Sequence, residues 1–213
     1  MLEPLPDEHF MREALRQAQK AHAAAEVPVG TVIVREDKII ARAYNEVELL
    51  KDATAHAEML ALTQAEAAVG DWRLTDCDLY VTKEPCAMCA GALVHTRIRR
   101  VIFGCADSSG GAAGSMMNLL QMPTLNHRCE ITSGVLHREC TAILQDFFRT
   151  RRDERGQAWI LGGDRWGVQL VSRQGEFRKD HDTGARGANG RRVGGGRGER
   201  RRQLPGSAPR SPA

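Results

Sequence analysis

The sequence has 213 residues, of which 42% are hydrophobic and 27% are charged, an ordinary composition for a globular protein. No run approaches the roughly 18 consecutive apolar residues of a membrane span, and the acidic segment Met1 to Leu15 is not expected to act as a secretory signal. A membrane protein, a collagen and a wholly disordered chain are therefore excluded. The six cysteines are expected to be reduced thiols or metal ligands, which predicts a cytoplasmic location and no membrane partner.

Charge divides the sequence into two parts. The formal net charge is +3, but residues 155–213 contain 12 Arg and one Lys against five acids, and hold 13 of the 21 Gly. This segment therefore carries a net charge of +8, and residues 1–154 carry −5. An Arg/Gly-rich composition cannot bury enough apolar surface to offset the entropy of ordering. We expect a folded domain over residues 1–154 and a disordered extension over residues 155–213.

Helical and strand patterns alternate along the first part of the chain. In chain order, residue spacing predicts helices over 7–24, 55–68, 87–95, 116–120 and 136–152, and strands over 29–34, 39–44, 79–82, 101–103 and 130–132. The turn at 36–38 joins the first two strands into a hairpin, which makes the sheet mixed rather than parallel. Helices interleaved with five strands predict a three-layer α/β/α sandwich with a five-stranded mixed sheet.

Four residues in two short segments carry the groups best suited to chemistry. Cys86 and Cys89 lie one turn apart at a predicted helix start, where the helix dipole favours thiolates. His56, at another helix start, can supply a third zinc ligand. Three protein ligands leave a fourth position open, which marks a catalytic zinc ion whose bound water ionises near neutral pH. Glu58 can take the proton of that water and pass it to a leaving nitrogen.

The two segments together are more informative than either alone. His-x-Glu followed by Pro-Cys-x-x-Cys is the pattern of zinc deaminases that act on nucleobases. The alternative is a structural zinc site closed by one of the other cysteines, which are Cys77, Cys105, Cys129 and Cys140. A structural site would leave Glu58 without a role.

The sequence resembles the bacterial-type tRNA-specific adenosine deaminases, within the cytidine deaminase-like superfamily, from about residue 7 to 154. The matching segments are 26–30, 53–58, 79–92, 111–115, 126–128 and 146–149. The resemblance implies a cytidine deaminase-like fold, one Zn²⁺ ion per subunit held by His56, Cys86 and Cys89, and Glu58 as the proton shuttle. It also implies a homodimer that converts the wobble adenosine of a tRNA anticodon stem-loop to inosine.

The resemblance further implies a set of substrate-binding residues. These are Val27, Pro28, Asn45, Ala57 and Asp107, the last of which is otherwise an exposed loop acid. The basic end of the last predicted helix adds Arg151, beside Phe147 and Phe148; the alternative for Arg151 is a cation placed favourably at a helix C-terminus. Apart from the resemblance, Asn45 is typical of a turn and Val27 and Pro28 of core packing before a strand. Phe147 and Phe148 suit either stacking of flipped bases or packing in the core.

Two other functions remain open at this point. The first is a related enzyme that deaminates a free base such as guanine or cytosine. The second is an RNA-binding subunit without catalysis that keeps zinc for structure. An intact Glu58 favours an enzyme over the second alternative.

Overall fold

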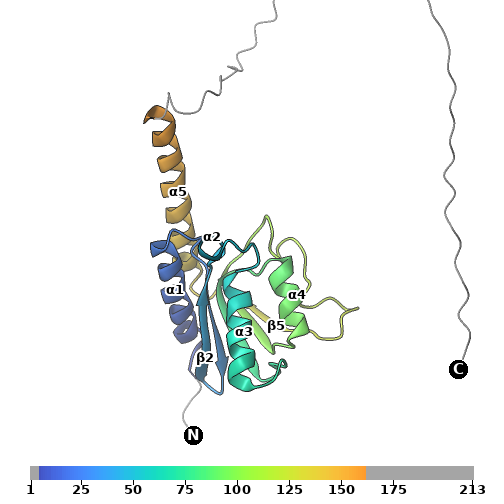
Figure 1. The fold of residues 1–213 in the computed structure, drawn as a ribbon. Helices are drawn as coiled ribbons and strands as arrows, with labels where there is room; N and C mark the ends of the chain where they lie inside the picture. The colour runs from blue at the N-terminus through green and yellow to red at the C-terminus, as the bar shows by residue number, and fades with distance from the viewer. Residues whose placement is uncertain (1–4, 162–213) are drawn as a thin grey trace, which may run out of the picture. The chain divides into compact units, whose positions relative to one another are not determined.

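The computed structural model describes residues 5–161 (Figure 1). Residues 162–213, which make up most of the expected extension, lie outside the described residues. The helices and strands are, in chain order, α1 (Asp7–Ala23), β1 (Gly30–Arg35), β2 (Lys38–Tyr44), α2 (Val47–Leu50), α3 (Ala57–Val69), β3 (Cys77–Lys83), α4 (Ala87–His95), β4 (Arg100–Cys105), β5 (Glu130–Ser133) and α5 (His137–Leu161). No helix among the described residues has the length and apolar character needed to cross a membrane.

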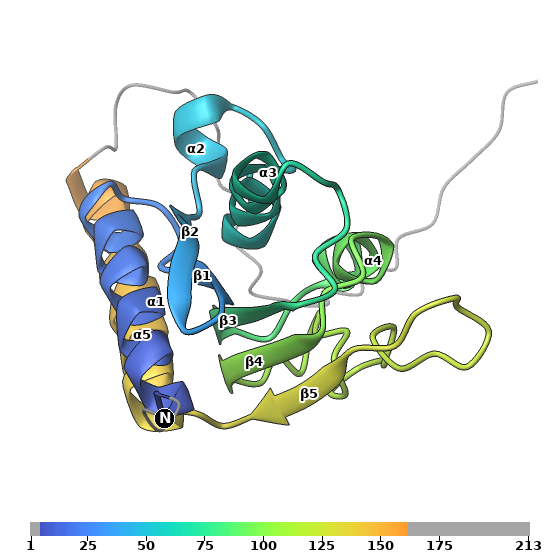
Figure 2. The same ribbon diagram turned by 90° about the horizontal axis from the view of Figure 1, so that it is seen from below.

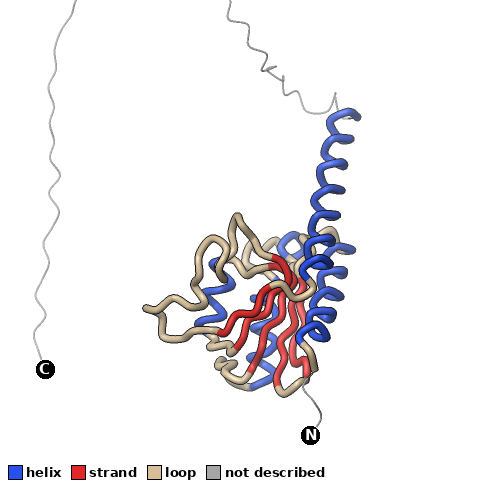
Figure 3. Tube along the Cα trace, turned by 180° about the vertical axis from the view of Figure 1, so that it is seen from behind, coloured by secondary structure: helices blue, strands red, loops and turns tan. Residues whose placement is uncertain are grey.

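The five strands form one mixed sheet in the order β2-β1-β3-β4-β5. Strand β1 pairs antiparallel with β2 and β3, whereas β3 with β4 and β4 with β5 are parallel. Figure 3 shows the strands of the sheet in red and the helices in blue. Helices α1 and α5 cover one face of the sheet, and α3 and α4 cover the other (Figure 2). The predicted three-layer α/β/α sandwich is therefore confirmed.

Side chains of the central strands alternate between the two faces. On β3, Leu79 and Val81 pack with Leu93 of α4, whereas Tyr80 points to the other face. There the Tyr80 ring lies 5.1 Å from the ring of Phe10 in α1, measured between centroids. Burial of each large apolar side chain contributes roughly 1.5–3 kcal/mol, so both layers of helices are held to the sheet.

One edge of the sheet gathers several chain segments. Gly30, at the start of β1, pairs with Tyr44 at the end of β2, and Lys83 at the end of β3 pairs with Cys105 at the end of β4. Strand β1 runs antiparallel to β3, so its beginning lies beside the end of β3. The segments before β1 and after β2, β3 and β4 therefore meet at this edge, and helices α3 and α4 begin there.

The predicted helix over 116–120 is wrong. The described chain forms an irregular loop there, in which the Leu119 N–H donates to the Ala112 carbonyl at 3.0 Å. The Cys129 N–H donates to the Leu120 carbonyl at 2.9 Å, and Leu120 is fully buried. These bonds between residues distant in sequence satisfy backbone groups that a short helix would otherwise use.

Two further differences concern the end of α5 and the presence of a short helix, α2. Helix α5 continues to Leu161, past the predicted end at residue 152, so it enters the segment expected to belong to the extension. The one-turn helix α2 was not predicted, because a single turn carries no periodic pattern. It ends at Lys51, which has the left-handed backbone conformation with φ 54°.

The contact between α1 and β1 depends on a glycine. A Cβ atom at Gly30 would lie 2.1 Å from the Ala14 carbonyl oxygen and 2.3 Å from the Ala18 nitrogen, both in the α1 backbone. We expect Gly30→Ala to lower the free energy of unfolding by about 3 kcal/mol, because the helix must move away from the sheet. The change is measured as a lower urea midpoint.

The matched control is Gly91→Ala in α4, where an added Cβ meets no atom within 4 Å. Alanine favours a helix over glycine, so this variant should keep or raise the free energy of unfolding by up to about 1 kcal/mol. Equal urea midpoints for the two variants would contradict the close contact at Gly30.

Candidate active site

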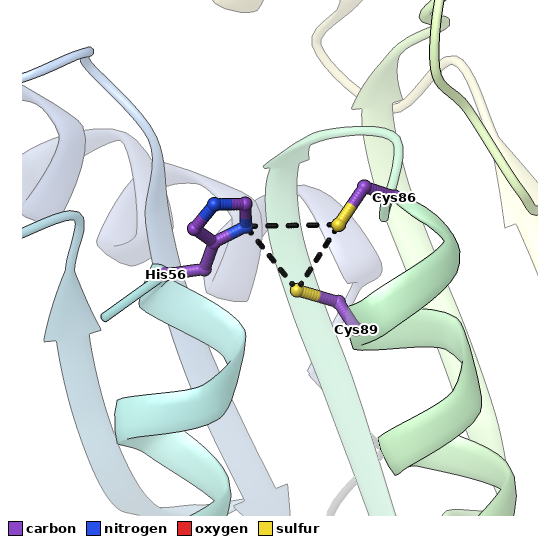
Figure 4. Close-up of side chains that lie close together, drawn as sticks. All are labelled: His56, Cys86 and Cys89. Carbon is purple, nitrogen blue, oxygen red and sulfur yellow. Dashed lines mark hydrogen bonds between the residues drawn. The ribbon is translucent and has the colours of Figure 1, made fainter. Parts of the chain in front are cut away.

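Three side chains suited to a metal ion meet where α3 and α4 begin. His56 is the N-cap residue of α3, Cys86 is the N-cap residue of α4, and Cys89 lies in the first turn of α4. His56 Nδ1 lies 3.7 Å from Cys86 Sγ and 3.5 Å from Cys89 Sγ, and the two sulfurs lie 3.7 Å apart (Figure 4). A tetrahedral zinc ion with bonds of about 2.0–2.3 Å separates its ligand atoms by about 3.3–3.8 Å. The spacing of these residues, the metal triad, fits such an ion.

The metal triad leaves a fourth position for another ligand. Within residues 5–161, no further His, Cys, Asp or Glu atom joins the three in a group that could hold one ion. The other cysteines are free and buried, and they are Cys77, Cys105, Cys129 and Cys140. The arrangement does not match a closed structural site with four protein ligands.

Hydrogen bonds within the metal triad shift the pKa values of its three side chains. Those between the Cys86 sulfur and the Cys89 and His56 side chains lower the pKa of Cys86 to about 3. The pKa of His56 is raised, chiefly by the same bond to Cys86, and the pKa of Cys89 is raised by its bond to Cys86 and by burial. A metal ion would take the place of the shared protons, and the partial positive charges of two helix N-termini stabilise the thiolates.

A cavity of ≈ 350 Å³ opens beside the metal triad. Its lining includes six of the residues singled out in the sequence, namely Val27, Asn45, His56, Glu58, Cys86 and Phe148. Glu58 is only 4% exposed yet reaches the cavity from the first turn of α3. Burial raises its pKa, because a charged carboxylate loses hydration there. The cavity thus combines a metal triad with a carboxyl group suited to hold a proton.

Five of the expected substrate residues lie outside this lining, and three of them are buried. Pro28 and Ala57 are buried, and Ala57 opens α3 between two residues that do line the cavity. Phe147 is 7% exposed, and its ring packs 5.8 Å from the His22 ring, so it forms part of the core between α5 and α1. Phe148, which is 46% exposed and lines the cavity, is the better placed aromatic for stacking on a base.

Asp107 and Arg151 also lie outside the cavity lining, and both are held by other groups. Asp107 Oδ2 lies 2.5 Å from Nζ of Lys83, which does line the cavity. Partial burial raises the pKa of Asp107, but hydrogen bonds from Lys83 and Ser109 outweigh burial and lower it to about 2. Arg151 donates to the Ala25 carbonyl at 2.6 Å, and its guanidinium stacks on the ring of Phe147.

Sequence reasoning missed two buried acids and a lysine in the cavity wall. Glu26, 1% exposed, accepts a hydrogen bond of 3.0 Å from Asn45 Nδ2 and one of 2.7 Å from the Leu49 N–H. Lys83 and Glu84 also line the cavity. Lys83 and Glu84 directly precede the Pro-Cys-x-x-Cys pattern and Glu26 directly precedes Val27, but no spacing rule distinguishes them from other charged residues.

Comparison with known proteins agrees with the site. The sequence profile of the MafB19-like deaminases matches residues 6–152. The tRNA-specific adenosine deaminase of Bacillus subtilis is 49% identical over 152 residues, which cover 71% of this chain and 94% of the relative. The chain belongs to the tRNA-specific adenosine deaminase family.

Further relatives of this deaminase agree. The tRNA-specific adenosine deaminase of Haemophilus influenzae is 45% identical over 150 residues, covering 70% of this chain and 87% of the relative. A solved structure from work on A-to-I editing by tRNA:A34 deaminases at the wobble position is 43% identical, with a TM-score of 0.62. That similarity covers 64% of this deaminase and 99% of the solved chain.

The metal triad of the deaminase should be necessary for binding zinc. We expect His56→Ala, Cys86→Ala and Cys89→Ala each to weaken zinc binding by more than about a hundredfold, since even changes outside the ligand set cost 10–100-fold. Bound zinc is measured by elemental analysis after dialysis against a weak chelator. The control is Cys129→Ala, because burial raises the pKa of Cys129 to about 12 and keeps it a thiol. Full zinc content in Cys86→Ala would contradict the assignment.

Proposed function

We propose that this deaminase converts the wobble adenosine of a tRNA anticodon to inosine, with one zinc ion per subunit. The observation that carries the proposal is that the metal triad and the buried carboxyl of Glu58 share one cavity. The tRNA substrate is supported by 49% identity to a tRNA-specific adenosine deaminase. The reaction class is hydrolysis, in which adenosine and water give inosine and ammonia.

The metal triad, His56, Cys86 and Cys89, would hold the zinc ion. When bound, the ion supplies a water acidified enough to act as a nucleophile at neutral pH. Two cysteines and one neutral histidine suit zinc, which needs no redox chemistry for this reaction. Cys89 and Ala57 are fully buried, so this part of the site is closed to bulk solvent.

Glu58 would carry the protons of the reaction. Its carboxylate takes a proton from the attacking water, whose oxygen adds to C6 of adenine, and delivers that proton to N1. It then transfers the second water proton to the amino group, which leaves as ammonia. A pKa raised by burial suits this task, because loss of hydration favours the form of the carboxyl that has taken up a proton.

Other residues would bind and orient the nucleoside. Glu26 fixes the Asn45 amide at the cavity wall, so that Asn45 can hydrogen-bond the base with little loss of side-chain entropy. Val27 and Phe148 would form apolar walls for the base, and the buried Pro28 follows Val27 in the chain.

The remaining anticodon stem-loop would contact the surroundings of the cavity. We assign this contact to Asp107 and to the partly exposed Arg151, with Phe147 supporting the Arg151 guanidinium. The backbone of Ala57, between two cavity residues, would face the base. A phosphate contact from the Arg151 guanidinium would position the RNA, whereas the flipped base would be read inside the pocket.

We further propose a homodimer in the cytoplasm, where tRNA is available as substrate. The free state of all six cysteines fits that location. Residues 1–154 would form the deaminase domain, and the Arg/Gly-rich residues 155–213 would form a disordered extension.

Glu58 should be required for turnover and not for binding zinc. We expect Glu58→Ala to lower kcat by about a thousandfold, because general acid–base catalysis contributes 10²–10⁴-fold. Zinc content should stay at the wild-type level. The control is Glu66→Ala, which removes a carboxylate from the same helix, away from the cavity lining. Substantial turnover by Glu58→Ala would falsify the proton-shuttle role.

The substrate is tested by measuring ammonia and inosine from an anticodon stem-loop that carries a wobble adenosine. Free adenosine, guanine and cytosine are assayed in parallel. We expect turnover with the RNA and at least about a hundredfold lower kcat/KM with the free compounds, because the flanking nucleotides supply binding energy. Deamination of a free base alone would keep the chemistry and exclude the RNA substrate. A zinc-loaded protein without any turnover would favour an RNA-binding subunit.

A further inference from the structure

Glu84 is a buried acid in the connection between β3 and α4. Its side chain is 2% exposed, and it lies between Lys83 and the Pro85–Cys86 segment. Among the side chains that the structure describes, residues 5–154, no Lys, Arg or His forms an ion pair with it. A buried carboxylate without a cation is stable only when hydrogen-bond donors replace its hydration. The hydrogen-bond donors around Glu84 therefore indicate the structural role of this residue.

All of these donors come from the loop that follows β4. Glu84 Oε1 accepts from the Ala113 N–H at 2.9 Å and the Ser115 N–H at 3.0 Å. Glu84 Oε2 accepts from the Asp107 N–H at 2.8 Å and from the Ser115 hydroxyl. One carboxylate thus ties together both ends of the segment 107–115, which we name the anchored loop.

The anchored loop is wrapped closely around the carboxylate. A Cβ atom at Gly111 would lie 2.3 Å from Glu84 Oε2 and 2.7 Å from the Asp107 carbonyl oxygen. The Ala112 N–H also donates to the Pro85 carbonyl at 2.8 Å, one residue before Cys86. The loop therefore has little freedom to move while these bonds persist.

The anchored loop begins with Asp107, which pairs with Lys83 at the wall of the cavity. The Glu84 bond to the Asp107 N–H fixes the backbone from which this ion pair is made. We propose that Glu84 is a positioning residue that acts through Asp107, setting the Asp107–Lys83 pair against the RNA that enters the cavity. This inference rests on the proposed function, because the pair is tested through RNA binding.

The two oxygens of Glu84 accept hydrogen bonds from different donors. A substitution that replaces one oxygen by an amide NH₂ should therefore break only some of these bonds. In Glu84→Gln, an amide NH₂ at the Oε1 position would face the N–H groups of both Ala113 and Ser115. At the Oε2 position it would face the Asp107 N–H alone, because the Ser115 hydroxyl can turn and accept. The second orientation leaves fewer donors unpaired, so Glu84→Gln should release Asp107 and keep Ala113 in place.

The experiment uses the full zinc-loaded chain and the anticodon stem-loop. We expect Glu84→Gln to lower kcat/KM for the RNA by about ten- to a hundredfold, mainly through KM, because a displaced positioning group costs alignment. Zinc content should remain at the wild-type level. Hydrogen exchange measured by NMR should show that the Asp107 amide loses protection while the Ala113 amide keeps it.

A double-mutant cycle distinguishes positioning from general stability. In the Asp107→Asn background, Glu84→Gln should change KM by less than about twofold, because the Asp107–Lys83 ion pair through which it acts is already removed. Gly111→Ala, which places a Cβ atom against the Glu84 carboxylate and the Asp107 carbonyl, should reproduce the rise in KM. The matched control is Asp78→Asn at the opposite end of β3, where the buried carboxylate binds Arg99. It should lower the melting temperature and leave kcat/KM within about twofold.

Three outcomes would overturn the inference. These are an unchanged KM in Glu84→Gln, an effect of equal size in the Asp107→Asn background, and equal loss of protection at the Asp107 and Ala113 amides. If the wild-type protein does not deaminate the RNA, the proposed function fails, and the exchange measurement still tests whether Glu84 holds Asp107.

Discussion

The geometry of the metal triad depends on the position of α3 and α4 along their axes as they pack against the sheet. His56 and Cys86 are 30 residues apart in sequence, yet their ligand atoms lie 3.7 Å from each other. A helix rises 1.5 Å per residue, so a slip of either helix by one residue would move its ligand by about that distance. Fully buried side chains such as Ala61, Ala65 and Leu93 fill the space between these helices and the sheet. Close packing of the core therefore serves as the spacing device for the site.

Three buried glutamates surround the cavity, and their environments give them different tasks. Glu26 and Glu84 accept hydrogen bonds from neighbouring segments and hold those segments in place. Although desolvation raises the pKa of Glu84, its hydrogen-bond donors outweigh that effect, and the net shift is downward. For Glu58, burial outweighs the polar contacts and the pKa rises. Two of these acids thus anchor the wall, and the environment of the third suits the proton transfer proposed for it.

Local patterns in the sequence were sufficient for much of the fold. Helix 87–95 was predicted with its observed bounds, since a proline before it and apolar spacing along it are local signals. The hydrogen bonds that hold the anchored loop to Glu84 and the true end of α5 were not predicted. The loop is shaped by donors that reach Glu84 from 23 to 31 residues away, and such contacts leave no periodic pattern. The metal triad could be anticipated because its residue types are rare, whereas Glu26 and Glu84 belong to a common type.

The burial of four cysteines limits which thiols of the protein can react with metal ions. Burial raises the pKa of Cys77, Cys129 and Cys140 to about 12, and that of Cys105 is also raised. The thiolate is the form that binds soft metals and attacks electrophiles, so these four residues are inert at neutral pH. Copper(I), cadmium or an alkylating agent would therefore react at the cysteines of the metal triad and not at all six thiols. The fold thereby confines the reactive cysteines to one place, the metal triad.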